Sequence, residues 1–335
     1  MLIIMNFKTF NDLALDIKNN LYKIHTGDYD LVVGIPRSGM IPAYIIGLYI
    51  NVNVTDLESY ILNNPFKKAA TRKLKHPILS PHEAKKVLLV DDSIISGNSL
   101  EYSLEKIPIS LKHKVTKLII YTDHNKRDDI DMYIEVLPLP RAFEWNIFHR
   151  KLLERACVDI DGVLCKDPTD DQNDDGSKYI DFLLNAKPHL LTSYKIHSLV
   201  TSRLEKYRPQ TEIWLKKNNI NYDNLIMLDL PSKEARLKNN AHATHKAKYF
   251  KSMKELEIFI ESNPEQAREI MEITGKPVFS VDQNFMHKPG LINEAFKNPN
   301  MLYRKTYMRI AINMPSWLKS ILKPIYKFIF QQNKN

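Results

Sequence analysis

The sequence has few of the features that mark secreted, membrane-spanning and repeat proteins. Its 335 residues include two cysteines, Cys157 and Cys165, which excludes a disulfide framework and favours a reducing cytoplasm. No uninterrupted apolar run is long enough to span a bilayer, and the apolar start Met1–Met5 lacks the pattern of a signal peptide. Internal repeats and low-complexity segments are also absent. The chain has the composition of an ordinary globular protein and is long enough for two domains, with 44% hydrophobic and 26% charged residues.

Positive charge is concentrated at one end of the chain. The formal net charge is +9, and from residue 284 onward nine lysines and arginines face a single acid, Glu294. The first 283 residues are therefore close to neutral. Because the basic residues belong to a tail rather than to a folded surface, we expect no nucleic-acid partner.

The first half of the chain alternates between apolar strands and helices. We expect strands over residues 31–33, 87–90 and 117–121, and helices over residues 10–25, about 40–50 and after Ser99. Residues 60–84 carry many Lys, Arg, Asn and Pro residues and are expected to form a mobile loop. This alternation predicts a parallel sheet that binds ligands at the carboxyl ends of its strands.

The most informative motif is residues 87–99, VLLVDDSIISGNS. Four apolar residues lead into Asp91 and Asp92, and a loop of small residues follows. Two carboxylates at the end of a buried strand are costly to desolvate unless a cation or hydroxyl groups occupy them. The loop offers free backbone N–H groups to a phosphate. The motif predicts a site for a phosphorylated ribose; a strand-end turn before a helix is the alternative.

Together with the loop Arg37-Ser38-Gly39, this motif resembles the type I phosphoribosyltransferases. The resemblance implies a Rossmann-like domain over residues 1–150 that binds phosphoribosyl pyrophosphate (PRPP) with Mg²⁺. It assigns the ribose hydroxyls to Asp91 and Asp92, and the pyrophosphate to Arg37, Ser38 and Gly39. It assigns the 5-phosphate to the loop formed by Ile95, Ser96, Gly97, Asn98 and Ser99. Ile95 departs from the family, in which a hydroxyl residue is more typical.

A hood segment, expected at residues 123–149, would recognise the acceptor. Its candidate contacts are Arg141, Glu144 and Trp145. Trp145 could stack on a base or on a sugar face, and a tryptophan packed in the core is an equal alternative. The basic residues of 60–84 would close over pyrophosphate or form a solvated loop.

A second β/α unit begins at Arg155. We expect strands over residues 156–158, 197–200, 225–228, 258–260 and 277–281, and helices over residues 209–219 and 245–250. The run Asp159-Ile160-Asp161-Gly162-Val163 follows the first strand and resembles motif I of the haloacid dehalogenase (HAD) superfamily. That resemblance implies a second Rossmann-like, HAD-type phosphatase domain over residues 151–285, with little or no cap. Asp159 would attack phosphorus, and Asp161 would act as general acid and then as general base.

Later segments follow the order of the other HAD motifs. Thr201 would donate to the phosphoryl group, and Lys246 would counter its charge, with Lys248 as a rival. Mg²⁺ would be held by Asp159, Asp161 and Glu261. Motif IV more often has two acids, and Asn263 stands where the second would be. The acidic cluster over residues 167–175 lacks the spacing of an EF-hand and is interpreted as a solvated loop.

Residues 286–335 are expected to form a basic, amphipathic helical tail. Within residues 315–331, Lys319, Lys323 and Lys327 recur every four residues opposite an apolar face. This is the pattern of a helix that lies on an anionic membrane surface. It would place a cytoplasmic protein peripherally on the inner face of the cell membrane. A terminal helix docked on the protein's own core is the alternative.

Three functions fit these motifs. The first is nucleobase salvage from PRPP, and the second is a regulator that senses PRPP. The third resembles the phosphoribosyltransferase–phosphatase fusions that install ribofuranose in bacterial surface polysaccharides, with a lipid-linked glycan as the acceptor. We favour the third because a phosphatase would remove the charge that retains a salvaged nucleotide in the cell. A homo-oligomer is left open.

Overall fold

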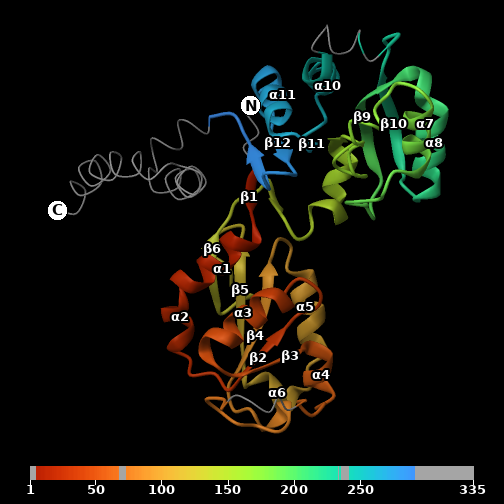
Figure 1. Ribbon diagram of the computed structural model, residues 1–335. Helices are drawn as coiled ribbons and strands as arrows, with labels where there is room; N and C mark the ends of the chain where they lie inside the picture. The colour runs from red at the N-terminus through yellow and green to blue at the C-terminus, as the bar shows by residue number, and fades with distance from the viewer. Residues whose placement is uncertain (1–4, 68–72, 233, 235–240, 291–335) are drawn as a thin grey trace, which may run out of the picture.

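The computed structural model describes residues 5–67, 73–232, 234 and 241–290, which form two α/β lobes (Figure 1). The first lobe is built on a parallel sheet in the order β3-β2-β4-β5-β6. Its strands are β2 (Leu31–Gly34), β3 (Asn53–Asp56), β4 (Val87–Ser93), β5 (Val115–Thr122) and β6 (Met132–Val136). β4, which carries the two acids, lies in the centre of this sheet between β2 and β5.

Helices cover both faces of the first sheet because successive strand residues point to opposite faces and are apolar on both. Val32, Leu88 and Val90 pack in one core with residues of α1 and α3. Leu31, Val33 and Leu89 pack in another with residues of α4 and α5. The helices are α1 (Phe10–Asn19), α2 (Leu21–His25), α3 (Met40–Ile50), α4 (Leu57–Ile61), α5 (Asn98–Glu105) and α6 (Ile109–Lys112), with a 3-10 turn at Pro81–Glu83.

The second lobe contains a six-stranded sheet in the order β10-β9-β8-β11-β12-β13. The strands are β8 (Ala156–Val158), β9 (Ile196–Leu204), β10 (Tyr222–Leu228), β11 (Ile258–Glu261), β12 (Val278–Ser280) and β13 (Phe285–His287). All neighbours are parallel except β12 and β13. One face packs against α7 (Ser177–Asn185) and α8 (Arg208–Lys217), and the other against α10 (Ala241–Ser252) and α11 (Pro264–Thr274).

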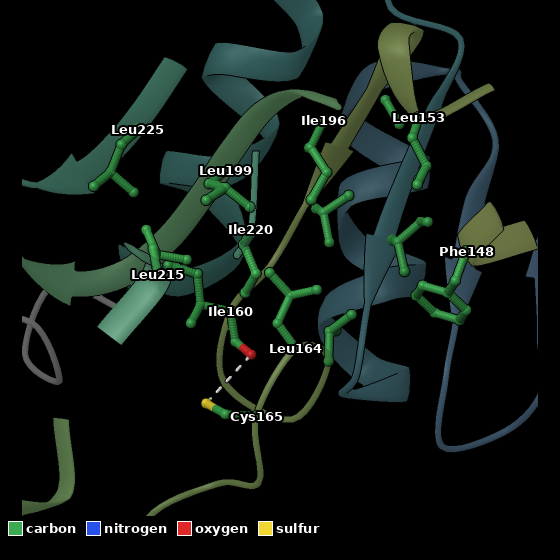
Figure 2. Packing of buried hydrophobic residues seen from close by; sticks show 14 of the residues in the cluster. Phe148, Leu153, Ile160, Leu164, Cys165, Ile196, Leu199, Leu215, Ile220 and Leu225 are labelled. Atoms are coloured by element: carbon green, nitrogen blue, oxygen red, sulfur yellow. Dashed lines mark hydrogen bonds between the residues drawn. The ribbon is translucent and has the colours of Figure 1, made fainter. Parts of the chain in front are cut away.

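A small parallel sheet joins the two lobes. β1 (Asn6–Lys8) pairs with β7 (Arg141–Phe143), and Phe7 lies opposite Ala142. The Phe7 ring is 5.0 Å from that of Phe279 on β12. Short 3-10 helices at Ile147–His149 and Lys151–Arg155 lead into β8, and Figure 2 shows Phe148 and Leu153 in the same core as Ile160. The end of the first lobe is therefore packed into the second.

Several elements differ from the sequence-based expectations. β4 and β9 extend further than predicted, so that Asp91, Asp92 and Thr201 lie within strands rather than after them. The helix expected over residues 10–25 is two helices separated at Asn20. Strands β1, β3, β6, β7 and β13 and helices α7 and α11 were not expected. The predicted boundary at residues 285 and 286 falls inside β13, and residues 291–335, with most of the predicted tail, lie outside the described part of the chain.

Within the segment 60–84, expected to be a mobile loop, the described residue Lys75 makes contacts at the far end of the sheet. Lys75 pairs through Nζ with the Asp28 carboxylate at 2.5 Å, and Asp28 precedes the start of β2. This ion pair therefore lies at the opposite end of the sheet from Asp91. In the ranges that the structure covers, no helix is both long enough and apolar enough to cross a membrane.

Candidate active sites

The first site lies where β2 and β4 end side by side. Asp92 is 4% exposed, and its carboxylate accepts two hydrogen bonds from other elements. Ser38 donates through Oγ to Oδ1 at 2.8 Å, and Trp145 donates through Nε1 to Oδ2 at 2.7 Å. The backbone N–H of Asp92 donates to Oδ1 of Asp91 at 2.9 Å. The structure thus brings together the loop after β2, the two acids and the predicted hood segment.

The electrostatics of this acid pair favour a ligand with hydroxyl groups. Burial raises the pKa of Asp91 well above its ordinary value, and the charge of Asp92 raises it further. Arg141 of the hood segment and Arg150, just after it, lie near enough for the charge of Asp92 to raise their pKa values, although burial dominates and lowers the pKa of both. The pKa of Arg141 falls to about 10. Hydroxyl groups would relieve the desolvation of the acids without adding charge.

The loop after β4 has the geometry of an anion site. Gly97 has φ +87° and caps α5, and the side chains of Ile95, Ser96, Asn98 and Ser99 are exposed. Two arginines fix the loop through its carbonyl groups. Arg127 donates to the carbonyl of Ile95 at 2.8 Å, and Arg141 donates to that of Ile94 at 2.6 Å. The sequence analysis did not predict this role for either arginine.

The second site is built around a buried lysine. Lys246 on α10 is 2% exposed, and its Nζ donates to Asp159 Oδ2 at 2.6 Å, Glu261 Oε2 at 2.7 Å and Gln266 Oε1 at 3.1 Å. Asp159 follows β8, and Glu261 ends β11, so two adjacent strands place their acids at one edge. Lys248 is exposed, which selects Lys246 as the motif III candidate.

The second acid of this site, Asp161, is bound by an arginine that sequence reasoning missed. Arg203 is fully buried and donates to Asp161 through Nε, at 3.0 Å to Oδ2, and through a terminal nitrogen, at 2.6 Å to Oδ1. Its backbone N–H donates to Thr201 Oγ1 at 3.2 Å. Residues two apart on a strand share a face. The spacing of Thr201 and Arg203 was therefore the one sequence signal that could have predicted Arg203 at this site.

The two carboxyls of the second site have opposite pKa shifts. Burial raises the pKa of Asp159 to about 7, against the opposing charge of Lys246. Burial also acts to raise the pKa of Asp161, but the Arg203 guanidinium outweighs it, and the pKa falls below its ordinary value. Asp161 is therefore ionised before a substrate binds.

Several carboxyl groups lie close to the second site. Burial raises the pKa of Asp167, and the charges of Asp161, Asp282 and Glu261 raise it further. Asp167 and Asp282 are thus two additional acids near this edge of the sheet. Among the described residues, no group of three or more His, Cys, Asp or Glu side chains is arranged to hold a metal ion. Mg²⁺ commonly takes one or two carboxylates and fills its shell with water and phosphate. Asp159 and Glu261 fit that need.

Asn263 has a structural role that the sequence analysis left open. Its side chain accepts from the backbone N–H groups of Glu265 and Gln266 at 2.9 and 3.0 Å, which caps the start of α11. The position of a second motif IV acid is thus taken by a helix cap.

Comparison with known families bears on the first lobe. Residues 6–152 match the family model described as phosphoribosyl transferase domain. Residues 6–152 form a phosphoribosyltransferase domain. No curated protein matches the chain.

Solved structures similar to this chain include two phosphoribosyltransferases. A purine phosphoribosyltransferase from Pyrococcus horikoshii is 19% identical over 43% of this chain and 95% of its own, with a TM-score of 0.32. A xanthine-guanine-hypoxanthine phosphoribosyltransferase from Helicobacter pylori is 20% identical over 43% and 94%, with a TM-score of 0.33. Similarities this low do not identify an acceptor.

Three residues of the phosphoribosyltransferase domain were predicted to contact the acceptor, and the structure corrects one of them. Arg141 is 4% exposed, and its terminal nitrogens donate to the carbonyls of Leu137 and Ile94, so it supports the loops instead. Glu144 accepts from the backbone N–H of Phe10 at 2.7 Å. Trp145 contacts Asp92 as described above. Arg37 is exposed and precedes Ser38, which contacts Asp92; a cis peptide bond joins it to Pro36.

Gly39 of the phosphoribosyltransferase domain is expected to tolerate no side chain. A Cβ atom there would lie 2.6 Å from the carbonyl oxygen of Ile35, 2.7 Å from that of Val90 and 2.9 Å from Asp91 Oδ1. Two of these neighbours are backbone atoms that cannot rotate away, so Gly39→Ala should force the pyrophosphate loop off β4. We expect a loss of about 1–3 kcal/mol in the free energy of unfolding, measured by chemical denaturation, and weaker PRPP binding. Gly275→Ala is the control, since nothing lies within 4 Å of its Cβ position, although its φ of +65° carries some strain. Equal PRPP affinity in Gly39→Ala and the unmodified protein would contradict this account.

Proposed function

We propose that this chain is a bifunctional ribofuranosyltransferase. It would transfer ribose 5-phosphate from PRPP to a glycan and release pyrophosphate. It would then remove the 5-phosphate to leave β-ribofuranose in a bacterial surface polysaccharide. The observation that carries the proposal is that one chain joins a phosphoribosyltransferase domain to a second buried acidic site, in which Lys246 contacts both Asp159 and Glu261.

The first reaction is mainly one of positioning. Asp91 and Asp92 would accept hydrogen bonds from the ribose hydroxyls, and the loop at residues 95–99 would bind the 5-phosphate through backbone N–H groups. Arg37 would contact the pyrophosphate. As the bond from C1 to pyrophosphate loosens, an acceptor hydroxyl attacks C1 from the opposite side and inverts it, so the α-linked donor gives a β-linked product, and the hydroxyl proton leaves with the pyrophosphate. The leaving pyrophosphate would carry Mg²⁺, which would neutralise part of its charge.

The second reaction would remove the 5-phosphate in two steps. The Asp159 carboxylate attacks phosphorus, and the bond from phosphorus to the ribose 5-oxygen breaks. The leaving oxygen takes a proton from Asp161, which receives it from the monoanionic phosphate ester when the substrate binds. Lys246 holds the charge of the attacking group, and Thr201 lies on the neighbouring strand β9. Asp161, ionised beside Arg203, is ready to accept the proton of the water that then attacks the phosphorylated aspartate. Mg²⁺ beside Asp159 and Glu261 would lower the repulsion between the anionic nucleophile and the phosphate.

The decisive experiment incubates the protein with PRPP, Mg²⁺ and candidate acceptors and follows products by mass spectrometry. Glycans should gain ribose without phosphate, and Asp92→Asn should abolish the transfer. Nucleobase salvage is the competing result: ribosylated bases with untouched glycans would overturn the polysaccharide assignment. Binding of PRPP without any transfer would favour the regulator.

The tail would attach this enzyme to the membrane that carries the acceptor lipid. Its basic amphipathic segment, residues 315–331, lies outside the described residues, and its sequence pattern supports this part of the proposal. Co-sedimentation with anionic liposomes should require these residues. Equal sedimentation after their deletion would contradict membrane attachment.

A further inference from the structure

We infer that Trp145 is a positioning residue that orients the Asp92 carboxylate for the ribose hydroxyls. This inference rests on the PRPP-binding part of the proposed function. If Trp145 has this role, recognition of PRPP also depends on the segment around Trp145, which the second lobe holds in place. The contacts of the Asp92 carboxylate and the packing of that segment support the inference.

The Asp92 carboxylate is clamped from two sides. Ser38 on the loop after β2 binds one oxygen, and Trp145 after β7 binds the other, at 2.8 and 2.7 Å. Hydrogen bonds of this length to a carboxyl group are strong and directional. With one donor on each oxygen, the carboxylate plane is fixed, and each oxygen keeps lone pairs for a ribose hydroxyl.

The indole that makes this contact is held by a stack of aromatic rings. Trp145 lies 4.7 Å from the ring of Phe143 at an interplanar angle of 16°, and Phe143 in turn stacks on Tyr121 at 5.4 Å. The ring of Phe10 lies 5.6 Å from Trp145. These rings come from β7, β5 and α1, so the donor nitrogen is preorganised by three elements.

The segment that carries Trp145 is anchored in the second lobe. Ala142 is fully buried, and so is Ile147, two residues after the indole; both belong to the core around β8 and β9. Phe148 joins the same core, as Figure 2 shows. A shift of the second lobe would therefore be carried to the indole and to Asp92. The donor site is completed by an indole that packs against the core of the first lobe, on a segment whose flanking residues pack in the second lobe.

The test compares Trp145→Phe with Trp145→His in the full chain. Phenylalanine keeps a stacking ring and removes the N–H group, whereas histidine restores an N–H donor. One charge-assisted hydrogen bond predicts that Trp145→Phe weakens PRPP binding about 10–100-fold, measured by isothermal titration with Mg²⁺. The KM for PRPP should rise more than kcat falls, because the contact acts in both the ground and the transition state. Trp145→His should recover a large part of the affinity.

The matched control is Tyr249→Phe, which removes a hydroxyl that shares a 2.9 Å hydrogen bond with Ser198 Oγ in the second lobe, at a core that does not contain Ala142 or Ile147. It should leave PRPP affinity unchanged, and Trp145→Phe should leave hydrolysis of p-nitrophenyl phosphate unchanged. Unaltered PRPP affinity in a folded Trp145→Phe protein overturns the inference alone. A loss in Trp145→Phe that histidine does not relieve assigns the effect to packing and overturns it as well. Failure of the unmodified protein to bind PRPP overturns the proposed function together with the inference.

Discussion

The substitution Asp159→Asn is expected to abolish phosphate release and to leave phosphoribosyl transfer intact. The carboxylate of Asp159 is the proposed nucleophile, and an amide of the same shape cannot take that role. Removal of a nucleophile costs on the order of 10⁴-fold or more in rate. Lys246 keeps its contact with Glu261 in this variant, so the site should remain folded. The product of PRPP and a glycan should then retain its phosphate, as measured by mass spectrometry.

Asp171→Asn is the matched control for this prediction. The Asp171 side chain is 77% exposed and pairs with an exposed lysine, Lys178, so its change should affect neither reaction. The outcome that contradicts the assignment is an Asp159→Asn protein that still releases phosphate at the rate of the control. Loss of transfer as well would indicate that the two sites are not independent.

Of the substitutions proposed here, Arg203→Met is expected to cause the largest decrease in the free energy of unfolding. The Arg203 guanidinium is fully buried and is bound to both oxygens of Asp161. Its removal leaves the Asp161 carboxylate, whose side chain is 20% exposed, without its cationic partner, which costs about 3 kcal/mol, the lower end of the range for a buried pair. Chemical denaturation of Arg203→Met should show this decrease in the free energy of unfolding, and phosphate release should fall with it.

Arg208→Met provides the comparison for that measurement. The Arg208 side chain is 34% exposed and pairs with Glu205 and Glu212 on the surface. Its loss should cost less than about 1 kcal/mol. A double change, Arg203→Met with Asp161→Leu, should recover much of the lost stability, because both buried charges are then absent. Equal losses for Arg203→Met and Arg208→Met would contradict the role given to burial.

Local patterns in the sequence predict the inner strands of the two large sheets and the position of the acids. The apolar run at Val87–Val90 predicts a central strand because its side chains are buried on both faces. The same run places Asp91 and Asp92 at the carboxyl end, where the structure has them. Asp159 and Glu261 follow apolar runs for the same reason, so adjacent strand ends bring them to a common edge.

Contacts between distant side chains are what the sequence could not predict. Trp145 and Asp92 are 53 positions apart, and the contact depends on how the hood segment packs. Arg203 has no local signal stronger than its spacing from Thr201. Asparagine is a common helix-capping residue, but α11 has no long apolar run that would predict a helix after Asn263. Asn263 was therefore interpreted only as the position of a missing second acid. In each case tertiary packing decides the role.

The boundary between the lobes shows the same limit. The sequence analysis ends the first domain at residue 150, where the β/α pattern restarts, and the family match ends at residue 152. The two lobes do not separate cleanly at residue 150, because Ala142 and Ile147 already belong to the core of the second lobe. A fragment cut at residue 150 would expose these apolar side chains to water.

The pairing of β1 with β7 has a consequence for the order in which the chain folds. Met5 and Phe7 pack in a core whose other members extend to Phe279 and Met286. Strand β1 can therefore take its final place only after the residues up to Met286 have been synthesised. Contacts at such a separation are slow to form, and a strand left unpaired for that time is a site for chaperones and for misassembly. β1 is thus among the last elements to reach its final place.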